Sequence, residues 1–138
     1  MTNRKKLIAV NQLEGRIQLL GQLSRTKIYH LMQDVLTLVL PSLSETQGIV
    51  LLEANANNTC VVASDLTAIR ETIEHQRNGL LCDPRRPSDF AKAILHLHYN
   101  PQEAEKMGEQ GRQIVANKFS WQAISEHTIK LYRQEMAA

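Results

Sequence analysis

Apolar residues in the first two thirds of the chain gather in short, nearly continuous runs. The longest covers residues 35–40 (VLTLVL) and stops at Pro41. Shorter runs cover residues 17–20, 60–63 and 80–82. A strand that is apolar on both faces is buried on both faces, which is typical of parallel strands in α/β proteins. The pattern therefore predicts a sheet of mostly parallel strands built from these runs.

Segments with helical spacing of apolar residues lie before and between the runs. The predicted helices cover residues 3–13, 27–34, 48–57 and 68–74. Within the first of them, residues 7–10 fit a short strand equally well. Because strands and helices alternate along the chain, the expected fold class is α/β, with a Rossmann-like open parallel sheet and flanking helices.

The last third of the chain is predicted to be helical. Pro87 and Pro101 suit the first turns of two helices, and Ser120 suits the N-cap of a third. The apolar stripe of this last helix, which we expect to pack in the core, consists of Trp121, Ile124, Thr128, Leu131 and Tyr132. No linker or repeat interrupts the chain, so residues 1–138 are expected to form one domain.

Composition excludes several classes of protein. The 16 basic and 14 acidic residues are well mixed and give a net charge of +2, so no basic stripe for nucleic acid is present. No apolar run approaches the roughly 20 residues of a membrane span. The two cysteines, Cys60 and Cys82, form no CxxC pair, and we interpret them as buried thiols of a cytoplasmic protein. His96 and His98 point to different faces of a helix and make no metal pair.

The segment most suited to chemistry follows the apolar run at 35–40. A polar loop there leads into a predicted helix that opens near Gly48, so the loop lies where open α/β sheets bind ligands. Unpaired backbone N–H groups at a helix start attract anions such as a diphosphate. Glu45 lies in the loop and Glu53 lies within the helix, where a carboxylate can accept hydrogen bonds from a ribose diol.

This segment resembles the sequence pattern of the retaining glycosyltransferases with the GT-B fold, often called group 1 or family 4. The residues that fit the pattern are Pro41, Ser42, Glu45, Gly48, Glu53 and Ala54. Further blocks that resemble the family, in the same order, lie at 17–21, 69–71, 78–81 and 118–121. The resemblance therefore covers nearly the whole chain.

The resemblance implies a role for each matching residue in binding a nucleotide-diphosphate sugar. Glu53 is expected to bind the ribose hydroxyls, and Gln47, Gly48 and Ile49 are expected to offer backbone N–H groups to the diphosphate. Glu45 is expected to lie near the donor sugar as the catalytic residue. Uridine diphosphate is the commonest nucleotide for the family.

Two further contacts and one absence follow from the same resemblance. Thr46 is expected to contact the sugar or a phosphate, and the loop that begins at Gly21 is expected to pass near the base. Members of the family are typically independent of metal ions and cofactors. The chain has no Asp-x-Asp motif that would hold a metal.

The chain also departs from the family pattern. Residues 58–60 (NTC) stand where members usually have Gly-x-Pro, and residues 67–68 (TA) stand where many have Gly-Gly. The family's first strands of this domain and its acceptor-binding domain have no counterpart in the sequence. We therefore expect the isolated chain to be inactive as a transferase and to need a second chain or domain. The alternative is a non-catalytic binding or interaction domain that keeps the fold.

One structural expectation follows from the missing strands. In the family, two strands separate those predicted here at 17–20 and 35–40. An apolar strand with an uncovered edge invites pairing with another strand. Either residues 17–20 pair beside residues 35–40, which we favour, or a second chain covers that edge.

Overall fold

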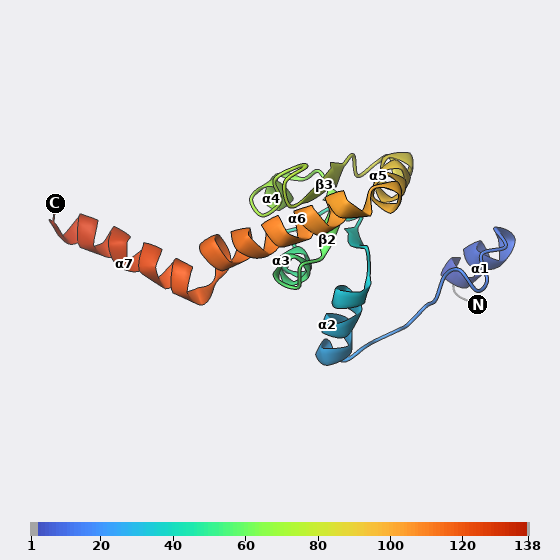
Figure 1. The fold of residues 1–138 in the computed structure, drawn as a ribbon, viewed down its shortest axis with the longest axis horizontal. Helices are drawn as coiled ribbons and strands as arrows, with labels where there is room; N and C mark the ends of the chain where they lie inside the picture. Colours follow the sequence, from blue (N-terminus) through green and yellow to red (C-terminus); the bar gives the residue numbers. More distant parts are fainter. Residues whose placement is uncertain (1–2, 138) are drawn as a thin grey trace.

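The computed structural model describes residues 3–137 and contains a parallel sheet of three strands. These are β1 (Thr37–Leu40), β2 (Cys60–Ser64) and β3 (Gly79–Cys82), in the order β1-β2-β3 (Figure 1). Val39 pairs with Val62 between β1 and β2, and Val62 pairs with Leu80 between β2 and β3. The structure thus confirms the α/β class, the parallel sheet and three of the predicted strands.

Helices precede, connect and follow these strands. Their bounds are α1 (Asn3–Val10), α2 (Arg25–Asp34), α3 (Ile49–Ala56), α4 (Thr67–Arg70), α5 (Pro87–Tyr99), α6 (Pro101–Ile114) and α7 (Trp121–Ala137), with a π-helical turn η1 (Val115–Phe119) before α7. Pro87 and Pro101 lie in the first turns of their helices, and the Ser120 hydroxyl accepts a hydrogen bond from the Ala123 N–H at 3.1 Å, as predicted. The helix predicted at 68–74 is shorter than expected, because it ends at Arg70.

The prediction of a strand at 17–20 is wrong. These residues form an exposed connection between α1 and α2, well away from the sheet (Figure 1). A short apolar run becomes a strand only where a neighbouring strand supplies hydrogen-bond partners, and none lies beside this one. The pairing of residues 17–20 beside β1 is therefore wrong too. Within residues 3–137, β1 pairs with β2 alone.

The core lies on both faces of β2, all of whose residues are buried. On one face, Cys60 and Val62 pack with residues of α5 and α6, including Leu97 and Met107. On the other face, Val61 packs with residues of α3 and α4 and with Met32 of α2. The predicted burial of both thiols is confirmed, and burial raises the pKa of Cys60 to about 11.

A buried polar network, which the sequence analysis missed, ties α3 to the start of β3. The Asn55 amide donates to the carbonyl oxygens of Thr59 and Asn78, each at 3.1 Å. The Asn78 amide donates to Asn55 Oδ1 at 2.8 Å and to the Thr72 carbonyl at 3.0 Å. Both asparagine side chains are fully buried, so these bonds replace the water that each amide loses on folding.

Helix α6 lies against this network through two glycines. A Cβ atom added at Gly108 would lie 1.9 Å from the Asn58 carbonyl oxygen, and one added at Gly111 would lie 2.5 Å from the Asn55 side chain. Asn58 itself has a φ of 61°, in the left-handed region where the family pattern has glycine. The close approach of α6 to the end of α3 thus depends on residues without side chains.

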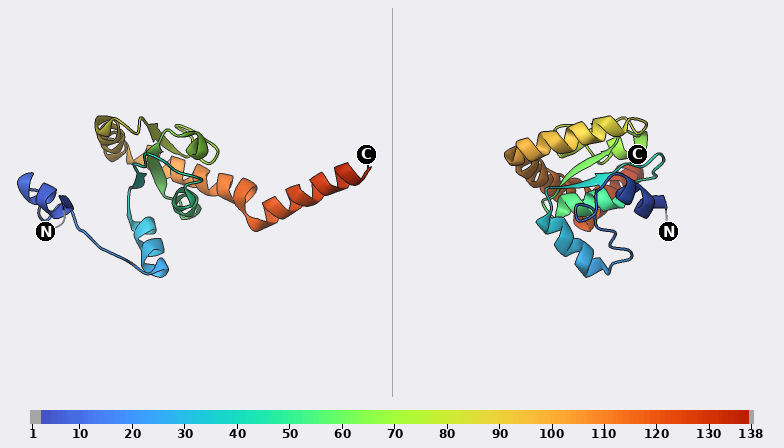
Figure 2. Two further views of the ribbon diagram at one scale, coloured as in Figure 1. Left: turned by 180° about the vertical axis from the view of Figure 1, so that it is seen from behind. Right: turned by 90° about the vertical axis from the view of Figure 1, so that its right-hand side faces the viewer.

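The two ends of the described chain extend away from the sheet in opposite directions (Figure 2). Neither α1 nor α7 has a buried residue among those described. The prediction that the stripe of α7 packs in the core is therefore wrong: Trp121 is 87% exposed and Tyr132 is 68% exposed. Among residues 3–137, no helix is long and apolar enough to cross a membrane.

Candidate functional site

The predicted site begins where β1 ends. After Leu40 the chain forms a loop and enters α3, so the loop lies at the carboxyl end of a parallel strand, as the sequence predicts. Gly48 precedes the helix with φ 67° and ψ 47°, a conformation that favours glycine. A Cβ atom there would lie 3.0 Å from Leu51 Cδ1, so the absence of a side chain also lets α3 close against its own loop.

The start of α3 presents backbone N–H groups with no acceptor inside the helix. Ile49 at this end is 60% exposed, and the neighbouring Thr46 and Gln47 are exposed as well. The positive end of the helix dipole lies at the same place. This arrangement is chemically suited to an anion with several oxygen acceptors.

Glu45 lies against its own loop. Its Oε1 accepts a hydrogen bond from the Thr46 N–H at 2.9 Å. Hydrogen bonds from the backbone N–H groups of Thr46 and Gly48 hold the pKa of the Glu45 carboxyl below its usual range. Glu45 is therefore ionised at neutral pH, and its carboxylate engages the backbone donors that lead into α3.

Glu53 lies one turn further along α3, on the side that faces α2. Its Oε1 is 2.9 Å from Arg25 Nη2 and 3.4 Å from the Tyr29 hydroxyl. The Arg25 Nε also donates to the Tyr29 hydroxyl at 2.9 Å, and the bond to Glu53 is the main reason that the pKa of Arg25 is raised. Sequence reasoning missed Arg25 and Tyr29 because nothing in the pattern placed α2 beside α3.

The structure brings most of the predicted residues together and leaves one apart. Those in the loop and on α3 are Glu45, Thr46, Gln47, Gly48, Ile49 and Glu53. Gly21 lies in the exposed connection before α2, with no atom within 4 Å of the position of a Cβ. Arg25, at the start of α2, is the residue of this neighbourhood that reaches α3.

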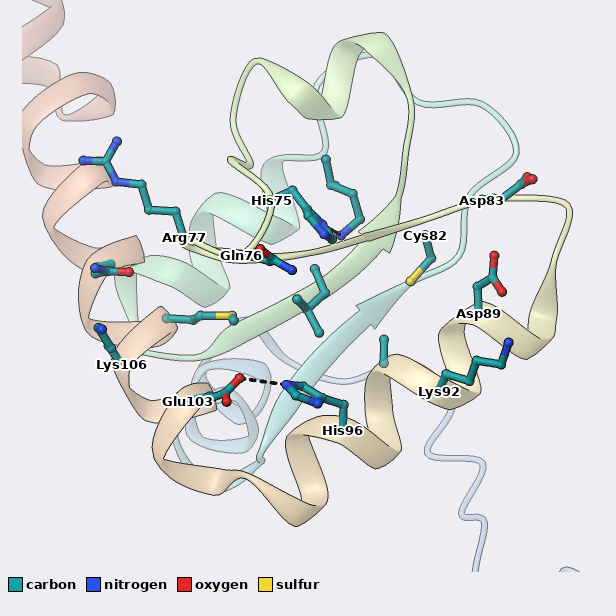
Figure 3. A pocket seen from close by; sticks show the side chains of 15 residues that line it. His75, Gln76, Arg77, Cys82, Asp83, Asp89, Lys92, His96, Glu103 and Lys106 are labelled. Atoms are coloured by element: carbon teal, nitrogen blue, oxygen red, sulfur yellow. Dashed lines mark hydrogen bonds and ion pairs between the residues drawn. The ribbon is translucent and has the colours of Figure 1, made fainter.

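A separate groove of about 990 Å³ lies between β3, α5 and α6 (Figure 3). None of the residues predicted for the site lines it. It mixes cationic Lys92 and Lys106 with anionic Asp89, and His96 and Glu103 bond each other across it at 2.7 Å. Because the lining of this groove carries charges of both signs, it favours neither an anionic nor a cationic ligand.

Residues 3–137 contain no group of three or more His, Cys, Asp or Glu side chains placed to hold an ion. The chemical groups at the start of α3 are backbone hydrogen-bond donors and the carboxylates of Glu45 and Glu53.

Comparison with known proteins places this geometry in a family. The family model described as "Glycosyl transferases group 1" matches residues 2–114. The D-inositol 3-phosphate glycosyltransferase of Paenarthrobacter aurescens is 37% identical over 99 residues, which are 72% of this chain and 24% of that protein.

The chain is also similar to solved structures of larger proteins. The sucrose-phosphate synthase of Thermosynechococcus elongatus superposes with a TM-score of 0.84 at 31% identity, over 96% of this chain and 33% of that one. HepE of Anabaena, in complex with UDP and glucose, superposes with a TM-score of 0.82 at 25% identity, over 94% of this chain and 35% of that one. The chain thus spans roughly a quarter to a third of the proteins that it resembles.

Proposed function

Because the chain belongs to the group 1 glycosyl transferases, we propose that it supplies the part of such an enzyme that binds the nucleotide-diphosphate sugar. The observation that carries the proposal is the start of α3, where the backbone N–H groups of the first turn stand beside two carboxylates, Glu45 and Glu53. Donors of this kind suit a diphosphate, and a carboxylate one turn along the helix suits the hydroxyls of the attached ribose.

The proposed ligand contacts follow the order of groups in a nucleotide sugar. The diphosphate lies on the backbone N–H groups of Gln47, Gly48 and Ile49, with Thr46 beside it. The ribose hydroxyls bond to Glu53. The nucleotide is most simply a uridine diphosphate sugar, which is supported by the UDP in the HepE complex.

The remaining proposed contacts lie at the two ends of the ligand. The base lies towards the connection that contains Gly21. Glu45 faces the donor sugar as the catalytic residue, and its carboxylate must first leave the loop N–H groups that it now engages. The diphosphate competes for the same donors, so nucleotide binding itself releases Glu45 towards the sugar.

We further propose that sugar transfer needs a partner: an acceptor-binding domain or a second chain. Positioning of two substrates and stabilisation of transition-state charge supply most of an enzyme's rate enhancement. The contacts proposed above hold the donor alone. The chain by itself is accordingly expected to bind nucleotide and to leave the glycosidic bond intact.

A cytoplasmic location is also part of the proposal. It rests on Cys60 and Cys82, which lie buried as free thiols on the same face of the sheet. Free thiols persist in reducing compartments, where nucleotide sugars are also available to an enzyme of this class.

The test is isothermal titration calorimetry with uridine diphosphate on the full chain and on Glu53→Gln. Loss of the charged acceptor is expected to weaken binding by about 5- to 150-fold. The matched control is Glu109→Gln, which removes the same charge from the exposed face of α6 and is expected to bind like the unmodified chain. Equal affinity of Glu53→Gln and the unmodified chain would contradict the assignment of Glu53.

A further inference from the structure

The side chain of Glu53 is already engaged in the free chain. Two donors meet at a single oxygen, Glu53 Oε1: the Arg25 guanidinium at 2.9 Å and the Tyr29 hydroxyl at 3.4 Å. Arg25 also donates to Tyr29 and lies with its guanidinium carbon 5.8 Å from the centre of the Tyr29 ring. These three side chains, which we call the Arg25 latch, join α2 to α3.

The contacts of the latch resemble those that a ribose would make. A vicinal diol binds a carboxylate with two O–H donors, and the latch presents Glu53 with an N–H donor and an O–H donor. The hydrogen bond from the guanidinium is also charge-assisted, because donor and acceptor carry opposite charges. A diol that binds the Glu53 carboxylate through both hydroxyls therefore competes with the Arg25 guanidinium for Oε1.

We propose that Arg25 is an internal competitor for the ribose: it holds Glu53 in the free chain and leaves it when a nucleotide binds. The inference rests on the function proposed above, because it concerns the carboxylate assigned there to the ribose. It adds a regulatory role for a residue that the family pattern does not include.

The two donors of the latch, the Arg25 guanidinium and the Tyr29 hydroxyl, differ in how easily they move. The Arg25 side chain is 77% exposed, so its guanidinium can turn into solvent without disturbing the core. Tyr29 is partly buried and packs against the core that contains Val61, so it stays in place. In the proposed exchange, the ribose replaces Arg25 at Glu53, while Tyr29 stays in place.

The size of the competition follows from this exposure. Exposed ion pairs couple weakly, by an amount that corresponds to about 1.4- to 5-fold in an equilibrium constant. Removing Arg25 is therefore expected to tighten nucleotide binding by about 1.4- to 5-fold. The gain depends on the ribose hydroxyls, because only a ligand that uses Glu53 has to displace the guanidinium.

The experiment titrates two nucleotides, uridine diphosphate and 2′,3′-dideoxyuridine diphosphate, into the full chain, Arg25→Ala and the control Lys27→Ala. Lys27 carries the same charge on the same helix, so its loss matches the change in net charge. Arg25→Ala is expected to bind uridine diphosphate more tightly than Lys27→Ala does. Both variants are expected to bind the dideoxy nucleotide equally. In the Glu53→Gln background, Arg25→Ala is expected to change neither affinity.

Several results would overturn the inference. If Arg25→Ala binds uridine diphosphate more weakly than Lys27→Ala does, the guanidinium is a ligand contact. If Arg25→Ala binds both nucleotides more tightly by the same factor, the effect does not depend on the ribose hydroxyls. If Glu53→Gln weakens uridine diphosphate while Arg25→Ala changes nothing, the latch fails and the donor site stands. When no chain binds uridine diphosphate, or Glu53→Gln binds like the unmodified chain, the donor site itself fails and the latch fails with it.

Discussion

Two neighbouring strands, β1 and β2, lie in very different surroundings although both are rich in aliphatic residues. Val62 of β2 is fully buried, whereas its register partner Val39 of β1 is 36% exposed. Strand β2 has a strand on each side and helices on both faces, while β1 has a single partner among the described strands. The comparison separates a densely packed region around β2, α3 and α6 from a more open one around β1 and α2.

The candidate site lies on the boundary between these regions. Helix α3 belongs to the packed side, so the donors at its start and the backbone that carries Glu53 are held in place by Leu51, Ala54 and Asn55. Helix α2 has one buried residue, Met32, and reaches the site through the exposed Arg25. The site thus combines a helix that is fixed by the core, α3, with a movable side chain on α2, so it can both hold a ligand and respond to it.

The largest effect on the packed side is expected from Gly108→Ala. The new Cβ atom would lie 1.9 Å from a backbone carbonyl oxygen, so α6 and the turn at Asn58 must move apart. Overpacking of this kind is expected to lower the free energy of unfolding by about 3 kcal/mol or more. Urea denaturation measures it, with the exposed neighbour Glu109→Ala as the control. A value within about 0.5 kcal/mol of the control would show that α6 does not pack as closely as described.

A smaller loss is expected from Asn78→Ala. The substitution removes two amide hydrogen bonds and the acceptor of the Glu74 N–H, and it leaves the buried Asn55 side chain without one of its partners. The free energy of unfolding is expected to fall by about 2–4 kcal/mol. Asn11→Ala, in an exposed position, is the control. Equal stability of the two variants would mean that water replaces the network at little cost.

The comparison of the strands themselves is sharpened by Val62→Ala and Val39→Ala, which make the same change at paired positions. Val62→Ala is expected to cost about 2 kcal/mol, because it empties a site that is packed on all sides. Val39→Ala is expected to cost less than about 1 kcal/mol. Similar losses at both positions would contradict the contrast between a densely packed β2 and a more open β1.

Much of the packed region could be predicted from the sequence. The apolar runs predicted at 35–40, 60–63 and 80–82 correspond to β1, β2 and β3 to within two residues at each end, because each run is buried among neighbouring elements, which is the condition that the pattern reflects. The loop before α3 was predicted for the same reason, since a polar stretch after a buried strand must lie at the end of the sheet. Pattern alone is informative where burial decides the structure.

The sequence-based predictions fail where burial does not decide the structure, and they miss the positions where polar groups are buried. Residues 17–20 and the stripe of α7 are apolar, yet the described chain offers them no partner surface, so neither the strand nor the core packing formed. Asn55 and Asn78 were missed because asparagine usually indicates a turn or a surface. The spacing of Gly108 and Gly111 on one face of a helix was the signal that another segment approaches closely there.

The central claim, that a nucleoside diphosphate binds at the start of α3, is tested most directly by following backbone amide chemical shifts during titration with uridine diphosphate. The account predicts that the amides from Thr46 to Val50 shift most at millimolar nucleotide, with smaller shifts at Glu53 and at Arg25 on α2. Residues around the groove of Lys92 and Lys106 are expected to stay unchanged. The claim would be contradicted if no amide between Glu45 and Glu53 moved, or if the shifts concentrated on that groove instead.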